Sequence, residues 1–271
     1  MGRRPAGLTC PSRSGREARG WHDARVPRDA VPTGPEAGRR PPVRGSVPAH
    51  VVHTEALTPR MRRVVLAGDG VAAPPTGPHV KLFWAARDGR PPGTRTYTVR
   101  AWRAGRMTVD VVLHGEVGVA APWAASAVPG DEVEVVGTGG LDVRAAGWYL
   151  LAGDESALPG IAAVLEGLPG TARGRALVEV SDAAERVDLP APPGVDVEWL
   201  LCDGRPAGTA DLLDPAVRAA GFAADGDGFV WLAAESGVVR GLRDHLRSTL
   251  GLTRRQVLAQ GYWRRGQAFE G

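Results

Sequence analysis

A six-residue segment in the first half of the chain combines side chains that can hold a flat, phosphorylated cofactor. Residues 95–100 read RTYTVR. In a strand, alternate side chains share a face, so Arg95, Tyr97 and Val99 point one way and the other three point the opposite way. An arginine can bind a phosphate, a tyrosine ring can lie against a planar cofactor, and Thr98 can donate to a ring nitrogen. The alternative is an edge strand that carries exposed polar residues.

A second segment places small residues between a strand and a short helix. Residues 109–115 are predicted to form a strand, and residues 118–124 read GVAAPWA. Small residues at a helix start leave backbone N–H groups free to bind a pyrophosphate at the positive end of the helix. Trp123 and Ala124 are expected to pack this helix on the preceding strands. A lone histidine such as His114 is more often structural than catalytic.

A third segment, residues 153–160, reads GDESALPG and follows a buried strand. Asp154, Glu155 or Ser156 can cap the next helix, and Pro159 is tolerated in its first turn. The junction after the carboxyl end of a parallel strand is where open α/β sheets bind ligands. Its carboxylates argue against simple phosphate binding by this loop, and an ordinary capped helix start is the alternative.

The elements that must position these segments change character near residue 146. From residue 44 to 145, short runs rich in β-branched and aromatic residues are punctuated by Gly, Pro and Asp, which is typical of an antiparallel β-barrel. These runs are VVHTEAL, RRVVLAG, HVKLFWAA, RTYTVRAW, RMTVDVVLHG and DEVEVVG. The GTGG segment, residues 137–140, is expected to be a flexible hinge.

From residue 146 to 271, strand candidates alternate with amphipathic helices, which predicts a parallel α/β sheet. The strand candidates are WYLLAG, ALVEVSD, VEWLLCD and FVWLAAES. The first helix is expected to bury one row of side chains, Leu158, Ile161, Leu165 and Leu168. The second helix, over residues 237–251, is expected to bury Val239, Leu242, Leu246 and Leu250.

Composition narrows the possible function classes. The chain has 271 residues and a formal charge of +3, but residues 1–43 carry +5, so the remainder is near −2. This balance argues against a nucleic-acid-binding surface. Only Cys10 and Cys202 are present, no Cys/His cluster has metal-ligand spacing, and no apolar run approaches the ~20 residues that cross a bilayer. We expect a cytoplasmic monomer without nucleic acid, bound metal or stable membrane association.

The N-terminal segment differs from the rest of the chain. Residues 1–43 are rich in Arg, Pro and Gly and lack the period of a helix or strand, which predicts a disordered tail. A transit peptide and a misplaced start codon are the alternatives. Mass spectrometry of the native N-terminus would distinguish them.

Six motifs occur in a fixed order along residues 44–271: RTYTVR, HGEVGVAAPWA, PGD, GTGG, GDESALPG and GYWRRG. In this order they resemble the siderophore-interacting protein family of FAD-dependent ferric-siderophore reductases, which belongs to the ferredoxin-reductase-like superfamily. The segment AAESGVVRGLRDHL is similar to a helix of that family. The sequence departs from the family pattern at Val119, Thr138, Gly160 and Ala234.

The resemblance implies a fold, two cofactors and a set of contacts. An FAD-binding barrel over residues 44–145 would precede an NAD(P)H-binding α/β domain over residues 146–271. Thr98 would lie near the reactive edge of the flavin and Tyr97 would position it, with no general acid or base assigned. The remaining FAD contacts implied are Arg95, Thr96, His114, Gly115, Gly118, Ala120, Ala121, Trp123, Ala124 and Thr138. The NAD(P)H contacts implied are Asp154, Glu155, Ser156, Ala157, Ser181 and Glu235.

The resemblance also implies an activity, in which a hydride passes from NAD(P)H to the flavin and single electrons then reduce Fe(III) in a chelate. Ser181 and Arg186 favour NADPH slightly, because they can receive a 2′-phosphate, whereas Asp182 opposes it. An anionic ferric siderophore would be attracted by Arg240, Arg264 or Arg265, although solvated surface positions are the more common role of such arginines.

Two residues and two functions stay open at this point. Tyr262 and Trp263 are expected to pack the last strand, and shielding of the flavin is the alternative. A flavin reductase with a different acceptor, or a non-catalytic siderophore-binding or utilisation protein, is the alternative function.

Overall fold

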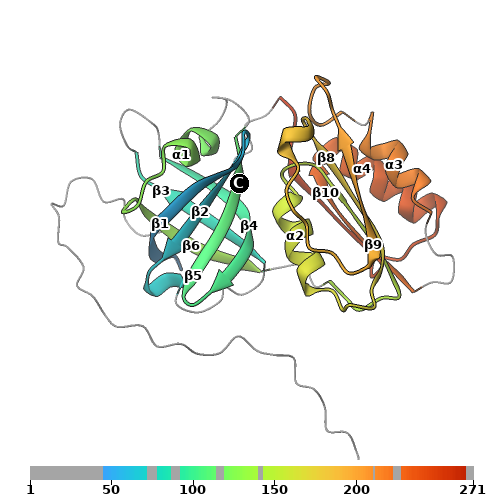
Figure 1. Ribbon diagram of the computed structural model, residues 1–271, viewed down its shortest axis with the longest axis horizontal. Helices are drawn as coiled ribbons and strands as arrows, with labels where there is room; N and C mark the ends of the chain where they lie inside the picture. Colours follow the sequence, from blue (N-terminus) through green and yellow to red (C-terminus); the bar gives the residue numbers. More distant parts are fainter. Residues whose placement is uncertain are drawn as a thin grey trace, which may run out of the picture. The chain divides into compact units, whose positions relative to one another are not determined.

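The computed structural model describes residues 45–71, 78–86, 92–113, 119–139, 143–209, 211–221 and 227–266. The predicted tail, residues 1–43, and the predicted FAD contacts His114, Gly115 and Gly118 lie outside the described residues. The chain first forms a closed antiparallel barrel and then a parallel sheet with helices (Figure 1). The predicted fold class is confirmed.

Six strands close the barrel in the order β1-β2-β5-β4-β3-β6, and β6 pairs back with β1. The strands are β1 (Val47–Thr58), β2 (Met61–Ala67), β3 (His79–Trp84), β4 (Gly93–Arg103), β5 (Arg106–Val112) and β6 (Glu132–Gly139). A 3₁₀ turn, η1 (Asp69–Val71), follows β2, and the short helix α1 (Ala120–Ser126) connects β5 to β6. Because side chains alternate along each strand, the inward positions fill the barrel with apolar residues, among them Val64, Leu66, Val80, Leu82, Met107, Val109, Val133 and Val135.

Five parallel strands form the second sheet in the order β11-β10-β7-β8-β9. They are β7 (Trp148–Gly153), β8 (Arg173–Val180), β9 (Gly194–Leu201), β10 (Gly228–Glu235) and β11 (Val257–Trp263). The connecting elements are α2 (Leu158–Gly167), η2 (Ala183–Glu185), α3 (Leu213–Ala219), α4 (Ser236–Asp244) and η3 (His245–Thr249).

Helices cover both faces of this sheet. On one face, Leu158, Ile161 and Leu165 of α2 pack against Tyr149 and Trp231, which lie on two central strands. On the other face, α3 and α4 pack against the alternate positions of the same strands, namely Leu150, Ala152, Val230, Leu232 and Ala234. The sheet is therefore buried on both sides, which explains why its strands are apolar runs without a polar period.

The second amphipathic helix differs from its prediction at one position. Val239, Leu242 and Leu246 are buried as expected, but Leu250 is 47% exposed. After Asp244 the chain continues as a π-helical turn, η3, in which the Leu250 N–H donates to the His245 carbonyl. This wider turn changes the angular spacing of the residues, so the prediction for Leu250, which assumed one regular helix, was wrong.

Two further differences concern shorter segments. The expected hinge at 137–140 is not separate from the barrel, because β6 continues through Gly139 and pairs with β3 to that point. Gly140 lies outside the described residues. The helix α3 was not predicted; it is only seven residues long, and its sequence LDPAVRA offers just two buried positions, Leu213 and Val217.

Candidate flavin and nucleotide site

The strand β4 presents its two faces to two different surroundings. Tyr97 and Val99 pack against the barrel core, whereas Thr98 is 8% exposed and faces Gly160 of α2, whose added Cβ would lie 3.7 Å from the Thr98 methyl group. Arg100 donates to the Glu166 carboxylate of α2. The predicted alternation is thereby confirmed for these four residues, and β4 is a barrel strand that contacts α2.

Two hydroxyl groups on β4 are buried without a hydrogen-bond partner among the described residues. They are Oγ1 of Thr94 and the phenol oxygen of Tyr97. Burial raises the pKa of Tyr97 above its ordinary value, so the phenol stays protonated and keeps a hydrogen to donate. Buried polar groups are normally paired, and these two hydroxyls point to opposite faces of the strand, so each face of β4 has one buried group that could bond to a ligand.

The other predicted flavin residues of β4 differ in exposure. Arg95 donates from Nη1 to the Thr94 carbonyl and is half-buried, while Thr96 is exposed. In register, Arg95 pairs with Leu82 and Thr96 pairs with Lys81. The strand therefore offers one cation on the core side and one hydroxyl on the outer side.

The short helix α1 packs on the barrel as predicted. Trp123 stacks on Trp84 with ring centroids 4.7 Å apart, and Ala121 and Ala124 are buried. Ala120 is half-buried and also contacts the barrel core. The buried side chains thus anchor the helix. Thr138, the last predicted FAD residue within the described part, is exposed at a register shift of β6.

The GDES loop at the end of β7 is held together by its own carboxylates. Asp154 accepts from the Ser156 amide and hydroxyl through one oxygen, and from the Glu235 amide (3.0 Å) and Trp263 Nε1 (2.7 Å) through the other. Burial raises the pKa of Asp154, and these four hydrogen bonds oppose the rise. The prediction that a side chain of this loop caps α2 was wrong: the N-cap is Ala157, which makes no side-chain bond, because Asp154 and Ser156 bond to each other.

Glu155 and Glu235 are also used for internal bonding. Glu155 accepts from the amide and the hydroxyl of Ser181 at the end of β8. Glu235 caps α4 by accepting from Gly237 and Val238, and its other oxygen accepts from the Arg265 amide at 3.3 Å. The structure therefore brings the predicted nucleotide residues to one edge of the sheet, where their carboxylates organise loops.

The β1–β2 turn of the barrel meets the loop after β8. Arg60 donates from Nη1 to the Ser181 hydroxyl at 3.2 Å, and its amide donates to the Glu185 carboxylate. Thr58 donates to the same Glu185 oxygen. Arg60 is a cation beside Ser181 that the sequence did not reveal, because it lies in the other half of the chain. Arg186, the predicted phosphate ligand, is exposed, and Asp182 caps η2 through the Ala184 amide.

Three residues from distant parts of the chain form a hydrogen-bonded chain at Thr98. The Tyr262 hydroxyl lies 3.3 Å from Thr98 Oγ1 and 2.8 Å from His79 Nε2. Tyr262 and Trp263 both come from β11, so this strand contacts Thr98 through one ring and Asp154 through the next. His79 was missed by the sequence reading, since a single histidine before an apolar strand has no distinguishing pattern.

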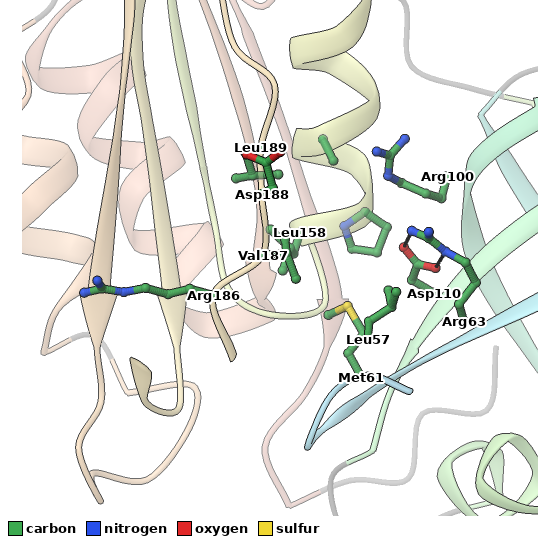
Figure 2. A pocket seen from close by; sticks show the side chains of 12 residues that line it. Leu57, Met61, Arg63, Arg100, Asp110, Leu158, Arg186, Val187, Asp188 and Leu189 are labelled. Atoms are coloured by element: carbon green, nitrogen blue, oxygen red, sulfur yellow. Dashed lines mark hydrogen bonds and ion pairs between the residues drawn. The ribbon is translucent and has the colours of Figure 1, made fainter. Parts of the chain in front are cut away.

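A cavity lies between the barrel and α2 (Figure 2). Its volume is about 420 Å³, and its lining includes Leu57, Met61, Leu158, Val187 and Leu189. Of its arginines, Arg63 is paired with Asp110 at 2.8 Å and Arg100 with Glu166. No predicted flavin contact lines it. The predicted substrate arginines, Arg240, Arg264 and Arg265, are exposed and do not line it either.

Comparisons with known proteins agree with this architecture. The family model described as "Siderophore-interacting FAD-binding domain" matches residues 83–142, and the model described as "Siderophore-interacting protein" matches residues 146–266. A siderophore utilization protein from T. fusca is 36% identical, with 83% of this chain and 95% of that chain covered and a TM-score of 0.74. This chain belongs to the siderophore-interacting protein family.

Other relatives extend the comparison. The ferric vibriobactin reductase ViuB of Vibrio cholerae is 30% identical over 241 residues, which are 80% of this chain and 88% of the relative. The siderophore-interacting protein SipS of Aeromonas hydrophila is 30% identical, with 82% and 92% coverage and a TM-score of 0.71. A ferredoxin reductase of carbazole 1,9a-dioxygenase, at 17% identity and a TM-score of 0.63, shares the fold alone.

Two further properties concern the described residues. No helix among them is long and apolar enough to cross a membrane. They contain no group of three or more His, Cys, Asp or Glu side chains that could hold a metal ion.

Proposed function

We propose that this protein is an NAD(P)H-dependent flavoprotein that reduces the ferric ion of a siderophore and thereby releases Fe(II). The observation that carries the proposal is β4, a strand with two unfilled buried hydroxyls that lies against α2 at the carboxyl edge of a parallel sheet. A ligand of the barrel and a ligand of the sheet would meet at this contact. The relative ViuB, named a ferric vibriobactin reductase, supports the acceptor.

FAD would be held mainly by β4 and α1. Arg95, Thr96, Tyr97 and Thr98 would bind and orient the flavin, and the Tyr97 hydroxyl has a hydrogen to offer it. The predicted FAD contacts between residue 114 and Ala124 would lie along the pyrophosphate and the adenine. The chemistry that FAD supplies when bound is the acceptance of a hydride and the delivery of single electrons. The protein contributes position and access.

The nicotinamide nucleotide would bind at the carboxyl edge of the sheet. Asp154, Glu155, Ser156 and Ala157 would shape its site. The carboxylates of Asp154 and Glu155 already accept hydrogen bonds within the protein, so they would hold the loop in place rather than bind the nucleotide directly. Arg60 donates to the Ser181 hydroxyl and would be a cation for a 2′-phosphate, and Arg186 is exposed in the loop after β8, which keeps the slight preference for NADPH. Glu235 would position α4 beside the nucleotide.

The ferric siderophore would approach through exposed cations. Arg240, Arg264 and Arg265 are all exposed, and the Arg265 amide bonds to Glu235 at the start of α4. An anionic chelate would be attracted by their charge. We place the domain boundary between β6 and β7, at residues 145 and 146, and expect a cytoplasmic monomer that binds no nucleic acid.

The proposal is tested with the purified full chain. FAD is added, unbound flavin is removed, and the holoprotein is mixed anaerobically with NADPH or NADH. Loss of the oxidised flavin absorbance establishes the donor. Ferric hydroxamate and catecholate chelates are then added with ferrozine, which traps Fe(II). Formation of the ferrozine complex at a rate that depends on protein and nicotinamide supports the proposal, and a chain that takes up no FAD contradicts it.

A non-catalytic siderophore-binding protein is the second candidate, favoured by the name of the T. fusca relative, a siderophore utilization protein. The same experiment separates the two. A binding protein would quench its tryptophan fluorescence with the ferric chelate but produce no Fe(II) with either nicotinamide.

A further inference from the structure

Thr98, Tyr262 and His79 form a continuous hydrogen-bonded chain. Thr98 Oγ1, the Tyr262 phenol and His79 Nε2 lie in sequence, with separations of 3.3 and 2.8 Å. A neutral imidazole with its hydrogen on Nδ1 accepts at Nε2; in that tautomer Tyr262 would donate to His79 and its oxygen would accept from Thr98. The Thr98 oxygen then keeps lone pairs free to accept from a further N–H group.

The surroundings favour this order. Thr98 and His79 are 8% and 7% exposed and lie opposite each other on neighbouring strands. Burial lowers the pKa of His79, so it is neutral near pH 7, and burial raises the pKa of Tyr262 to about 12, so the phenol keeps its hydrogen. The Trp231 ring of β10 packs edge-on against the Tyr262 ring. The negative charge of Asp154 also raises the pKa of Tyr262.

The proposed reaction creates a need for such a chain. In each turnover of the proposed reaction, the hydride from the nicotinamide would be divided into two electrons, one for each of two ferric ions, and one proton that must reach solvent. Thr98 is buried and has no ionisable group of its own. Within the described part of the chain, the Tyr262 hydroxyl lies within hydrogen-bond distance of Thr98, so a proton accepted at Thr98 can pass to it.

We propose that Thr98, Tyr262 and His79 form the proton exit of the flavin site, with His79 as the end farther from the flavin. Thr98 accepts the proton at Oγ1 and gives its own to the Tyr262 oxygen, Tyr262 gives its hydrogen to His79 Nε2, and His79 releases the hydrogen of Nδ1 to solvent. Electrons go to the two ferric ions and the proton goes to water, so the step is balanced. The inference rests on the proposed function.

A purely structural role for the same bonds is the competing explanation, because they also join β11 to the barrel. The two roles differ in what replaces them. A proton acceptor supplied from solution can restore a relay, but it cannot restore a packing contact.

The experiment uses holoprotein of wild type, His79→Ala and Tyr262→Phe. Each is reduced anaerobically and mixed with a ferric hydroxamate, while flavin reoxidation and proton release to an indicator dye are followed. We expect both variants to reoxidise about 100-fold more slowly. Added imidazole should restore His79→Ala and leave Tyr262→Phe slow. His53→Ala, at an exposed histidine, and Tyr149→Phe, at a buried phenol bonded to the Ala146 amide, are the matched controls and should behave as wild type.

A second readout needs neither flavin nor turnover. In the apoprotein, the ¹⁵N signals of His79 should show a neutral ring with its hydrogen on Nδ1, and Tyr262→Phe should shift the Nε2 signal. Reoxidation at the wild-type rate in FAD-loaded His79→Ala, or a His79 ring with its hydrogen on Nε2, overturns the proton exit and leaves the reductase intact. Failure of the wild type to bind FAD overturns the proposed function instead.

Discussion

The strand β4 and the carboxyl edge of the parallel sheet both contribute to the candidate site, but their polar groups are in different conditions. On β4, the hydroxyls of Thr94 and Tyr97 are buried and unfilled among the described residues. At the sheet edge, Asp154 alone accepts four hydrogen bonds. A strand with unfilled groups is suited to bind a ligand directly, whereas a saturated edge is suited to hold loops in place for one.

The largest expected effect comes from removing the carboxylate that organises the sheet edge. Asp154→Ala leaves the Glu235 amide and Trp263 Nε1 without their acceptor, so we expect the free energy of unfolding to fall by about 3 kcal/mol. FAD affinity should change little, because β4 is untouched. Urea denaturation and flavin titration measure the two quantities. Asp196→Ala, at an exposed position of β9, is the control, and an equal loss there would contradict the assignment.

Glu179 lies near the end of β8, and a variant at this position tests whether hydrogen bonds offset the cost of burying its charge. It accepts from the Leu213 amide, yet burial raises its pKa to about 7 from an ordinary value of 4.5. The folded state binds this proton more tightly than the unfolded state does, so the free energy of unfolding falls as pH rises from 4.5 to 7. Above pH 7, the free energy of unfolding of Glu179→Gln should exceed that of the wild type by up to about 3 kcal/mol.

The measurement for Glu179→Gln is urea denaturation at several pH values. The advantage of the variant should vanish near pH 4.5, where wild-type Glu179 is protonated in the folded state. Glu198→Gln, at a half-buried ion pair with Arg175 on β9, is the matched control and should show no such gain. A difference between Glu179→Gln and wild type that does not depend on pH would refute the explanation.

Tyr97→Phe removes one of the two β4 hydroxyls that have no hydrogen-bond partner among the described residues. Because the phenol has no partner among the described residues, its removal should leave the stability of the apoprotein within about 0.5 kcal/mol of wild type. FAD affinity should fall about tenfold, since one hydrogen bond to the ligand is lost. Tyr149→Phe should show the reverse, with lower stability and unchanged FAD affinity, because its phenol accepts from the Ala146 amide. If the two variants lost stability and FAD affinity to the same extent, the Tyr97 hydroxyl would have no special role in binding FAD.

The smallest effect is expected where the barrel reaches the sheet edge. Arg60→Ala should raise the KM for NADPH about fivefold and leave the KM for NADH unchanged, because Arg60 beside Ser181 would bind the 2′-phosphate. Steady-state reduction of a ferric chelate with each nicotinamide measures both values. Arg106→Ala, at an exposed barrel arginine, should change neither. Parallel changes with both nicotinamides would assign Arg60 a structural role.

The fold could be predicted from the sequence because strands of both kinds leave local patterns. Alternation identified β4, and apolar runs identified β7 and β10. The π-helical turn that exposes Leu250 leaves no such pattern, because it depends on how the helix ends rather than on which residues are apolar. Periodicity assumes a constant twist, and it fails where the twist changes.

The site was only partly predictable for a related reason. The residues of RTYTVR and GDES were found because each motif is contiguous, but their partners are not. His79 and Tyr262 are 183 positions apart, and Arg60 lies 121 positions from Ser181. Such pairs carry no spacing signal, since only the folded chain brings them together. For the same reason the sequence suggested free carboxylates at Asp154 and Glu155, and the structure shows them bonded.

The close approach of α2 to the sheet at Gly160 has an evolutionary consequence. A Cβ at this position would meet the Trp231 ring at 2.8 and 3.0 Å, so a side chain larger than glycine fits only if that ring or the helix shifts. A smaller residue at position 231 would remove this clash for an alanine at position 160. Positions 160 and 231 should therefore covary among members of this family, and an ancestor that exchanged one must have accommodated the other.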